Sequence, residues 1–495
     1  MSKLPQDQRD LLLSDLSQMG SSGRAESERN DTFRHTFFPV AEHVRAFDPD
    51  VVLIVGERGS GKSELFRAVV KEKLLDSILR STPGSHLSRV GSKNTHWLEG
   101  YPLGREFPDA RGLQRYVQAH KEDPETLPNL WFAYLFRVLR GHLLSSNLQN
   151  ASALLSRSGG EVDEIVDEFR KAKNLPLVLL DQLDARLEKA GDWIFVSYDE
   201  LDVLGGYEWD TMVRAIQGLV SFWASYTRRW SRIRAKLFLR TDLFRRHWQQ
   251  LGADLSKLAA NRAEVSWSDR NLYGMLVKRI ANTSDALKEY CELGRLKFET
   301  DAELGLIPQL EKAEDARPLI DRMVGQYMGA NIKKGSTFRW LLGHVRDGND
   351  RAMPRALVRL IEEAAQLERE VPRATHNRLL APTSLRRALD RVSEEHVLQV
   401  NTHELPWLPG VAARLKGEGV PMQRSEAEKA LARDFDRSWS QGNDSIRPPV
   451  DKPADLVDYL VEIGVFRPRS HGRIDVPDLF LAGLGMTRKG GVARR

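Results

Sequence analysis

Residues 51–63 read VVLIVGERGSGKS, and this stretch decides the fold. Its first five residues are apolar and mostly β-branched, which is typical of a strand buried on both faces of a parallel sheet. The next eight, GERGSGKS, have the spacing G-x-x-x-x-G-K-[ST], and helical periodicity follows over residues 63–74. A buried strand, a Gly-rich turn and a helix in this order predict a phosphate-binding loop.

Each residue type in this loop has a chemical reason. Glycines let the backbone curl so that successive N–H groups face phosphate oxygens. Lys62 would place a positive charge at the β- and γ-phosphates, and the Ser63 hydroxyl would ligate Mg²⁺. The alternative, a Gly-rich loop that only turns the chain, explains the glycines but not Lys62 and Ser63 at the start of a helix. The predicted nucleotide-binding residues are Gly56, Glu57, Arg58, Gly59, Ser60, Gly61, Lys62, Ser63 and Glu64.

Phosphate transfer also needs an acid at the end of a neighbouring strand to hold Mg²⁺ through water. Two stretches compete, LVLLDQLD at 177–184 and WIFVSYDELD at 193–202. The first has leucines at helical spacing, whereas the second is a compact β-type run. We therefore predict that Asp199 positions the metal and that Glu200 polarises the attacking water. Asp202 could share the role of Glu200, and the alternative for Glu200 is a solvated loop acid.

Two arginines are further candidates for the catalytic machinery. A third predicted strand, KLFL at 236–239, ends at Arg240, which is suited to spreading γ-phosphate charge. Arg355 follows Pro354 at the start of a predicted helix, where a helical lid could bring it onto bound nucleotide. For both, the alternative is a surface arginine in an arginine-rich stretch.

Together these segments resemble AAA+ ATPases and, more widely, STAND-like and origin-recognition-like bacterial ATPases. The resemblance covers about residues 32–370, and residues 265–280 resemble the lid-entry segment of bacterial defence-island ATPases. It implies ATP and Mg²⁺ as cofactors, ATP hydrolysis, and a nucleotide-gated switch or assembly in bacterial anti-phage defence or mobile-element biology. ATP is also favoured because the sequence has no guanine-specifying N-K-x-D tetrad. The matching motifs are Walker A (51–63), Walker B (193–202), sensor one (236–242, with Arg240 in place of Asn) and sensor two (353–360).

The expected fold class is α/β, with a parallel-sheet P-loop core of AAA+ type, a helical insertion, an α-helical lid and a C-terminal winged-helix-like module. In residues 454–495 a helix ending at Gly464 precedes two short strands joined by the turn SHG, which resembles the last helix and wing of a winged helix. The N-terminal segment is expected to be a loose arm or a docking helix. The predicted boundaries are 1–30 for the arm, 31–245 for the core with its insertion at about 76–190, 246–400 for the lid, and 401–495 for the module.

Composition limits which compartments, ligands and partners the sequence allows. The single cysteine, Cys291, permits no internal disulfide and fits a reducing cytoplasm, and no run is apolar enough to span a membrane. The 74 basic and 69 acidic residues nearly balance, so net charge alone does not argue for nucleic acid. The C-terminal module could bind DNA or a protein. No nuclease or metal motif is evident, so we expect a protein partner to carry any effector activity; a homo-oligomer is compatible with the motifs, although no arginine finger is identifiable.

Overall fold

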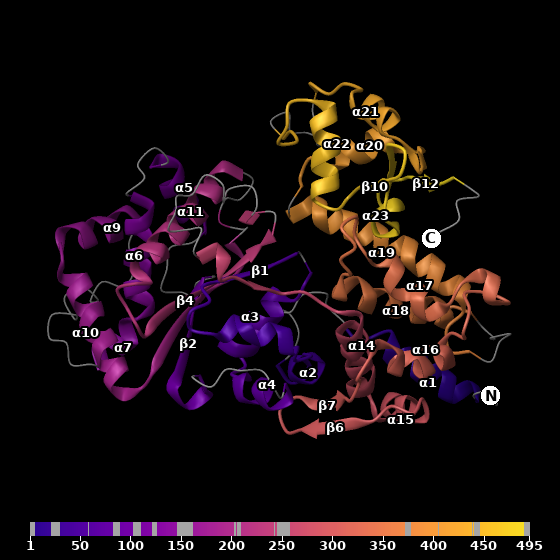
Figure 1. Ribbon diagram of the computed structural model, residues 1–495, viewed down its shortest axis with the longest axis horizontal. Coiled ribbons are helices and arrows are strands. Elements are labelled where there is room, and N and C mark those ends of the chain that lie inside the picture. The colour runs from indigo at the N-terminus through magenta and orange to yellow at the C-terminus, as the bar shows by residue number, and fades with distance from the viewer. Residues whose placement is uncertain are drawn as a thin grey trace. The chain divides into compact units, whose positions relative to one another are not determined.

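The chain forms two compact units in the computed structural model (Figure 1). The core unit is Pro39–Ser266, and the lid unit combines Met1–Phe38 with Trp267–Arg495. The structure describes residues 5–20, 30–57, 59–82, 90–101, 110–120, 126–145, 162–201, 204, 209–241, 243–244, 258–371, 378–403, 405–437, 439 and 446–489. None of the described helices is both long and apolar enough to cross a bilayer.

The core unit is built on a five-stranded parallel sheet with the order β2-β3-β4-β1-β5. All five strands run in the same direction, so their carboxyl ends meet at one edge, where open α/β sheets bind ligands. The predicted strands at 51–55, 193–198 and 236–239 are confirmed as β1, β3 and β4. The strands are β1 (Leu53–Gly56), β2 (Thr95–Tyr101), β3 (Trp193–Tyr198), β4 (Ile233–Arg240) and β5 (Ala263–Glu264).

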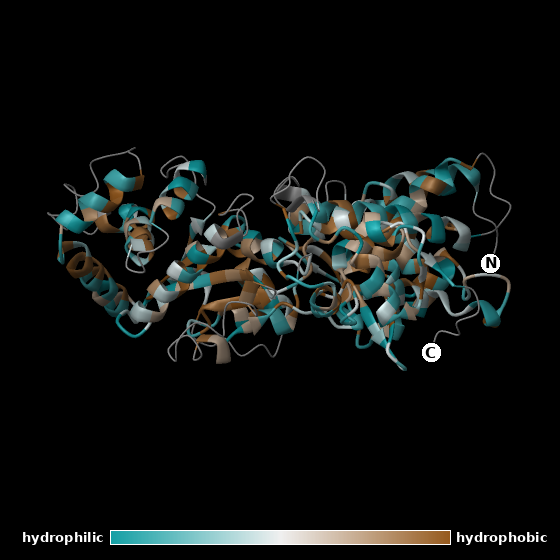
Figure 2. Ribbon diagram, turned by 90° about the horizontal axis from the view of Figure 1, so that it is seen from above, coloured by the Kyte–Doolittle hydropathy of each residue, from teal (hydrophilic) through white to brown (hydrophobic). Residues whose placement is uncertain are grey.

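Helices cover both faces of this sheet, whose strands are largely hydrophobic (Figure 2). On one face α3 (Lys62–Val70) packs through Phe66, whose ring meets Phe238 of β4 edge-on at 5.7 Å. On the other face, α6 (Thr126–Val138) places Trp131 against Tyr198 of β3, with ring centroids 6.0 Å apart. The indole of Trp131 also donates to the carbonyl of Ala215 in α11 (Trp209–Tyr226) at 2.9 Å. The sheet is therefore buried on both sides, as its continuous apolar strands require.

The helical insertion between β2 and β3 contributes to this core. Its buried residues belong to the same hydrophobic cluster as the sheet face beneath α6 and α11. Besides α6 it comprises α5 (Ala110–Ala119), α7 (Arg140–Ser145), α9 (Val162–Lys171) and α10 (Leu175–Ala190), while η2 (Ala41–Phe47) and α4 (Leu75–Ser81) flank β1 and α3.

Seven strands in the described part of the chain are not predicted from the sequence: β2, β5, β6, β7 and three two-residue strands of the C-terminal module. β2 lies in a stretch that reads as irregular because THWLEGY contains glycine and charge, and most of its side chains are only half-buried. β5 has two residues, too few for a periodic signal. β6 (Phe298–Asp301) and β7 (Gly305–Pro308) form an antiparallel hairpin whose residues are mostly not buried.

The lid unit is mainly helical and shares one large hydrophobic cluster. Its first helix, α1 (Gln6–Leu16), packs against α18, where Arg9 forms a buried ion pair with Glu368 at 2.5 Å. The N-terminal segment is thus a packed helix, one of the two expected alternatives. The other principal helices are α2 (Asn30–Thr36), α14 (Asp269–Thr283), α15 (Asp285–Leu293), α16 (Arg317–Met323), α17 (Thr337–His344), α18 (Pro354–Arg369) and α19 (Pro382–His403).

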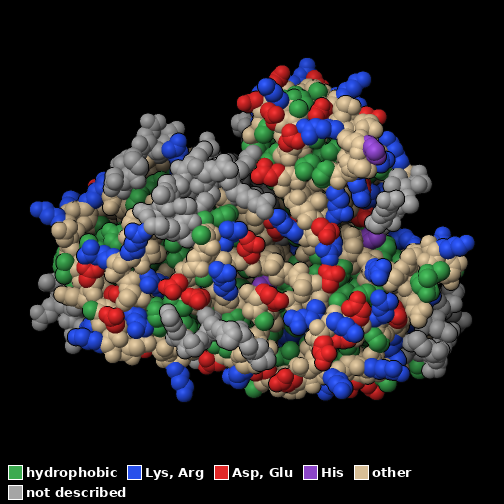
Figure 3. Space-filling view, viewed as in Figure 1, with side chains coloured by type: hydrophobic (Ala, Val, Ile, Leu, Met, Phe, Trp, Pro, Cys, Tyr) green, Lys and Arg blue, Asp and Glu red, His purple; other side chains and the backbone are tan. Residues whose placement is uncertain are grey.

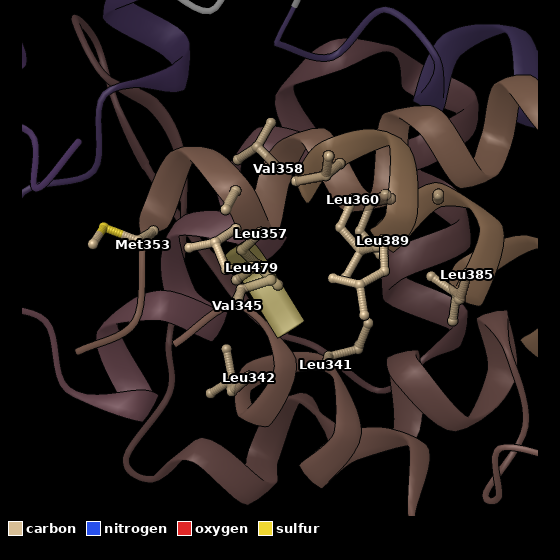
Figure 4. Packing of buried hydrophobic residues seen from close by; sticks show 14 of the residues in the cluster. Leu341, Leu342, Val345, Met353, Leu357, Val358, Leu360, Leu385, Leu389 and Leu479 are labelled. Carbon is tan, nitrogen blue, oxygen red and sulfur yellow. The ribbon is translucent and has the colours of Figure 1, made fainter. Parts of the chain in front are cut away.

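The C-terminal part of the lid unit has winged-helix order: helix, strand, two helices and a two-stranded wing. Strand β9 joins the wing strands in an antiparallel sheet ordered β10-β11-β9. Leu479 of this module lies beside Leu357 of α18 and Val345, the residue after α17 (Figure 4), so the two parts share a core. The elements are α20 (Leu408–Leu415), β8 (Gly419–Val420), β9 (Met422–Gln423), α21 (Arg424–Leu431), α22 (Pro453–Glu462), β10 (Arg467–Arg469), β11 (Arg473–Asp475), α23 (Asp478–Leu481) and β12 (Thr487–Arg488).

Candidate nucleotide-binding site

The Gly-rich loop lies between the carboxyl end of β1 and the start of α3. Gly59 and Gly61 have φ angles of 69° and 94°, in the left-handed region that side chains disfavour. A Cβ on Gly56 would lie 2.5 Å from the Ser60 hydroxyl oxygen and 3.2 Å from the carbonyl oxygen of Val265. The three glycines are therefore required by the path of the backbone, which curls tightly before the helix begins. Arg58 lies outside the described residues.

Lys62 occupies the mouth of this loop. Its ammonium donates to the carbonyl oxygens of Gly56 at 2.9 Å and Glu57 at 2.8 Å, and the side chain is buried. Ser63 is the second residue of α3, so its hydroxyl and the first backbone N–H groups of the helix lie at the same end. A buried ammonium, a hydroxyl and helix N–H groups at one tight turn fit a triphosphate with its Mg²⁺. Glu64 follows in the first turn of the helix.

Val265 packs against the loop at Gly56, a contact that is not predicted from the sequence. It follows β5, and its backbone N–H donates to the carbonyl of Val55 at 2.8 Å. This bond holds Val265 against Gly56, which explains why residue 56 has no room for a side chain. No sequence signal marks it, because β5 is too short to show periodicity.

Asp199 and Glu200 follow β3 directly, at the sheet edge that carries the loop. Asp199 is 4% exposed, and its backbone N–H donates to the carbonyl of Tyr101 at 2.8 Å. Glu200 has a φ of 52°, a left-handed conformation that costs a non-glycine residue about 1 kcal/mol or more. Such backbone outliers cluster at functional sites. Asp202 lies outside the described residues.

The competing acids at 177–184 lie on α10, a helix as their spacing predicts. Asp184 accepts hydrogen bonds from the backbone N–H groups of Ser231, Arg232 and Ile233 at 2.8, 2.7 and 2.9 Å. Asp181 pairs with Arg229 at 2.6 Å, which holds the pKa of Asp181 below its ordinary value. Both acids therefore fix the amino end of β4, which is the sheet edge opposite the loop.

Arg240 lies at the loop's edge of the sheet. It is the last residue of β4, is buried, and stands in register beside Gly56 of β1. Because β4 separates β1 from β3, the ends of these two strands lie two strand spacings apart, about 10 Å. A group of triphosphate size spans such a distance. The structure thus brings together the loop, the Asp199–Glu200 pair and Arg240 at one edge.

Arg355 belongs to the lid unit, in the first turn of α18. The loop before this helix is docked on the C-terminal module: the N–H of Gly348 donates to the carbonyl of Gly464 at 2.6 Å. Arg467 of β10 donates to the carbonyl of Asp347 at 2.7 Å. The module thereby fixes the segment from which Arg355 emerges, and the role of Arg355 toward nucleotide stays a prediction.

The charges on the surface of the C-terminal module help to decide whether this module binds DNA or a protein. Helix α22, the third helix of the winged-helix order, exposes Asp455, Asp458 and Glu462. Asp475 of wing strand β11 pairs with Arg469 of β10 at 2.7 Å and with Arg488 of β12 at 2.6 Å. An acidic helix face is poorly suited to phosphate backbones. Elsewhere, in the described part of the chain, no cluster of three or more metal-ligating side chains is present.

Neither protein-family models nor curated proteins match the chain. Among solved structures, it is similar to a Walker-type ATPase of Pyrococcus abyssi, with a TM-score of 0.40, 13% identity, and coverage of 93% of this chain and 99% of that chain. It is also similar to the ORC2 protein of Aeropyrum pernix in ADPNP–ADP complexes, with a TM-score of 0.38, 14% identity, and coverage of 88% and 86%. The parallel sheet and the position of the loop between β1 and α3 define an α/β core with a P-loop, as predicted.

Proposed function

We propose that this protein binds ATP with Mg²⁺, hydrolyses it, and uses its nucleotide state as a switch or to drive assembly. The observation that carries the proposal is the glycine loop at the end of β1, with the Lys62 ammonium in its mouth. Asp199, Glu200 and Arg240 at the same sheet edge support hydrolysis.

Each residue then has a defined task. Lys62 would exchange its two backbone carbonyl partners for phosphate oxygens, and the Ser63 hydroxyl and Asp199 would hold the metal. Glu200 orients and polarises the attacking water, while Arg240 spreads charge that develops on the outermost phosphate. Bound Mg²⁺ neutralises phosphate charge. Arg355 would report nucleotide occupancy to the lid unit.

The test of binding is nucleotide affinity by calorimetry, with ATP and Mg²⁺, for Lys62→Ala and a matched control. Lys71→Ala is the control, because Lys71 caps the far end of the same helix and is 44% exposed in an ion pair with Glu99. We expect Lys62→Ala to weaken affinity at least tenfold, and Lys71→Ala to leave it unchanged. If Lys62→Ala binds ATP as wild type does and both variants melt alike, the site assignment is wrong.

The test of hydrolysis is turnover by Glu200→Gln. We expect turnover to fall about 100-fold or more while affinity for ATP stays, as for the loss of a group that acts on the attacking water. Unchanged turnover would assign the role to another acid.

A second candidate is a nucleotide-bound scaffold that hydrolyses little and docks a partner. The acidic exposed face of α22 favours a protein over DNA as the partner of the C-terminal module. Tight ATP binding with background turnover in the wild type would favour this candidate. A setting in bacterial anti-phage defence or mobile-element biology stays a prediction from the motif resemblance.

A further inference from the structure

Two segments of the lid unit contain basic residues and no acidic residue. Residues 322–346 and 378–389 have no Asp or Glu, although the whole chain has 69. On the face drawn in Figure 3, basic and acidic side chains are mixed over most of the surface. Two segments with positive charges and no negative ones depart from this pattern. We therefore ask whether the fold places the two segments side by side.

The fold joins the two segments. The backbone N–H groups of Leu379 and Leu380 both donate to the carbonyl of Met323 at 2.9 Å. Arg386 of α19 donates from its guanidinium to the carbonyl of Met328. These bonds place the start of α19 against the segment that follows α16, so the two acid-free stretches form one surface.

A hairpin projects from this surface. The N–H of Met328 donates to the carbonyl of Gly335 at 3.0 Å, and the N–H of Thr337 donates to that of Gln326 at 2.9 Å. At the tip, η6 (Ile332–Lys334) exposes 72% of Ile332, an unusual position for a large aliphatic side chain. The bonds across the hairpin fix its path, so Ile332 is held outward beside two lysines.

The cations on and beneath the hairpin are exposed. Within the described residues none of them forms an ion pair with a carboxylate, whereas the neighbouring Arg391 pairs with Glu363 at 3.4 Å. A set of unneutralised cations attracts a polyanion more strongly than internally paired arginines do. This set, here called the basic surface, comprises Lys333, Lys334, Arg339, Arg386 and Arg387.

We propose that the basic surface binds duplex DNA. The five cations would contact phosphates, and Ile332 at the hairpin tip would enter the minor groove, where apolar side chains wedge against base pairs. Two features favour DNA over a membrane: the tip offers a single large apolar side chain, and the cations lie on separate elements rather than along an amphipathic helix. DNA would thus contact the lid helices, not the wing.

The experiment is fluorescence anisotropy of the full chain with a labelled duplex of about 30 base pairs and mixed sequence, at several salt concentrations. Lys333→Ala with Lys334→Ala should weaken binding about tenfold and lower the salt slope by about 2, one unit for each lost phosphate contact. The matched control is Lys297→Ala with Lys312→Ala, two exposed lysines of the same unit. The control should bind as wild type does.

Further variants separate the two roles and the two surfaces. Ile332→Ser should weaken binding several-fold without changing the salt slope, because it removes a groove contact and no charge. Arg469→Ala in the wing should leave affinity unchanged. Wild-type affinity in the double-lysine variant, loss only in the wing variant, or binding to anionic vesicles but not to duplex would each overturn the proposal. The assay without nucleotide keeps this result independent of ATP binding.

Discussion

Arg240 and Gly56 are register partners on adjacent parallel strands, so the last residue of β4 stands beside the first glycine of the phosphate loop. The guanidinium is buried there, near the place where the outermost phosphate would lie. We expect Arg240→Ala to lower ATP turnover at least tenfold and to change ATP affinity much less, because the charge on this phosphate rises during transfer. Steady-state kinetics and calorimetry check this. Arg229→Ala, at the opposite edge of the sheet, is the control; equal turnover in both variants would contradict the assignment.

The left-handed backbone of Glu200 predicts an order of stability among its variants. Glycine adopts a φ of 52° without penalty, whereas alanine does not. We expect Glu200→Gly to be more stable than Glu200→Ala by about 1 kcal/mol, and both to lose turnover equally. Urea unfolding measures the first difference. Greater stability of the alanine variant would show that residue 200 is not held in this conformation.

Substitutions of Asp184 and Asp199 should have different effects, the first on stability and the second on turnover. Asp184→Ala leaves three buried or half-buried backbone N–H groups of the β4 entry without their acceptor, so we expect it to lower the free energy of unfolding by about 3 kcal/mol. Asp199→Ala should change stability less and abolish the Mg²⁺ dependence of turnover. Thermal unfolding and a magnesium titration of activity distinguish the two. Loss of Mg²⁺ dependence only in Asp184→Ala would reverse the assignment of the Walker B acid.

Asp347 predicts a pH dependence of the lid unit. Burial raises the pKa of Asp347 to about 6, above its ordinary value of 3.8, so the folded state retains this proton where the unfolded state has lost it. The stabilising contribution is therefore full below about pH 4 and is lost as the pH rises through about 6. We expect Asp347→Asn to stabilise the unit at pH 8 by about 1 to 3 kcal/mol and to have little effect near pH 4.

Hydrogen exchange over residues 337–369 at the two pH values is the measurement for Asp347→Asn. The asparagine side-chain oxygen can still accept from the N–H groups of Asn349 and Arg351, both at 2.9 Å from the present carboxylate. Faster exchange in the variant at pH 8 would show that the anion is the stabilised form.

Continuous apolar runs make the central strands predictable. The stretches at 51–55 and 193–198 are almost entirely buried, an environment that is typical of strands in a parallel sheet covered on both faces. Helical spacing likewise separates 177–184 from the strand at 193–198, although both contain leucines or valines followed by acids. The loop residues are predictable because phosphate binding restricts both their type and their spacing.

Edge strands, and surfaces formed by segments distant in the chain, are harder to predict from the sequence. β2 pairs with one neighbour and keeps half-buried side chains, so it needs no apolar run, and β5 contributes only two residues. Val265 packs against Gly56 of the loop because it follows β5, which pairs with β1. The basic surface combines two segments about 50 residues apart in the chain. Their positive charges lie on one surface because the backbone bonds to Met323 hold the segments together.

The position of α1 has a consequence for the order of events during synthesis. The core unit is continuous in sequence, so its sheet can close before the second half of the chain leaves the ribosome. α1 emerges first, but Glu368, the partner of Arg9, follows 359 residues later. Until α14, α15 and finally α18 have been synthesised, the leucines of α1 lack the helices that bury them, so they stay exposed on the nascent chain. Slow translation between residues 267 and 368 would lengthen that exposure.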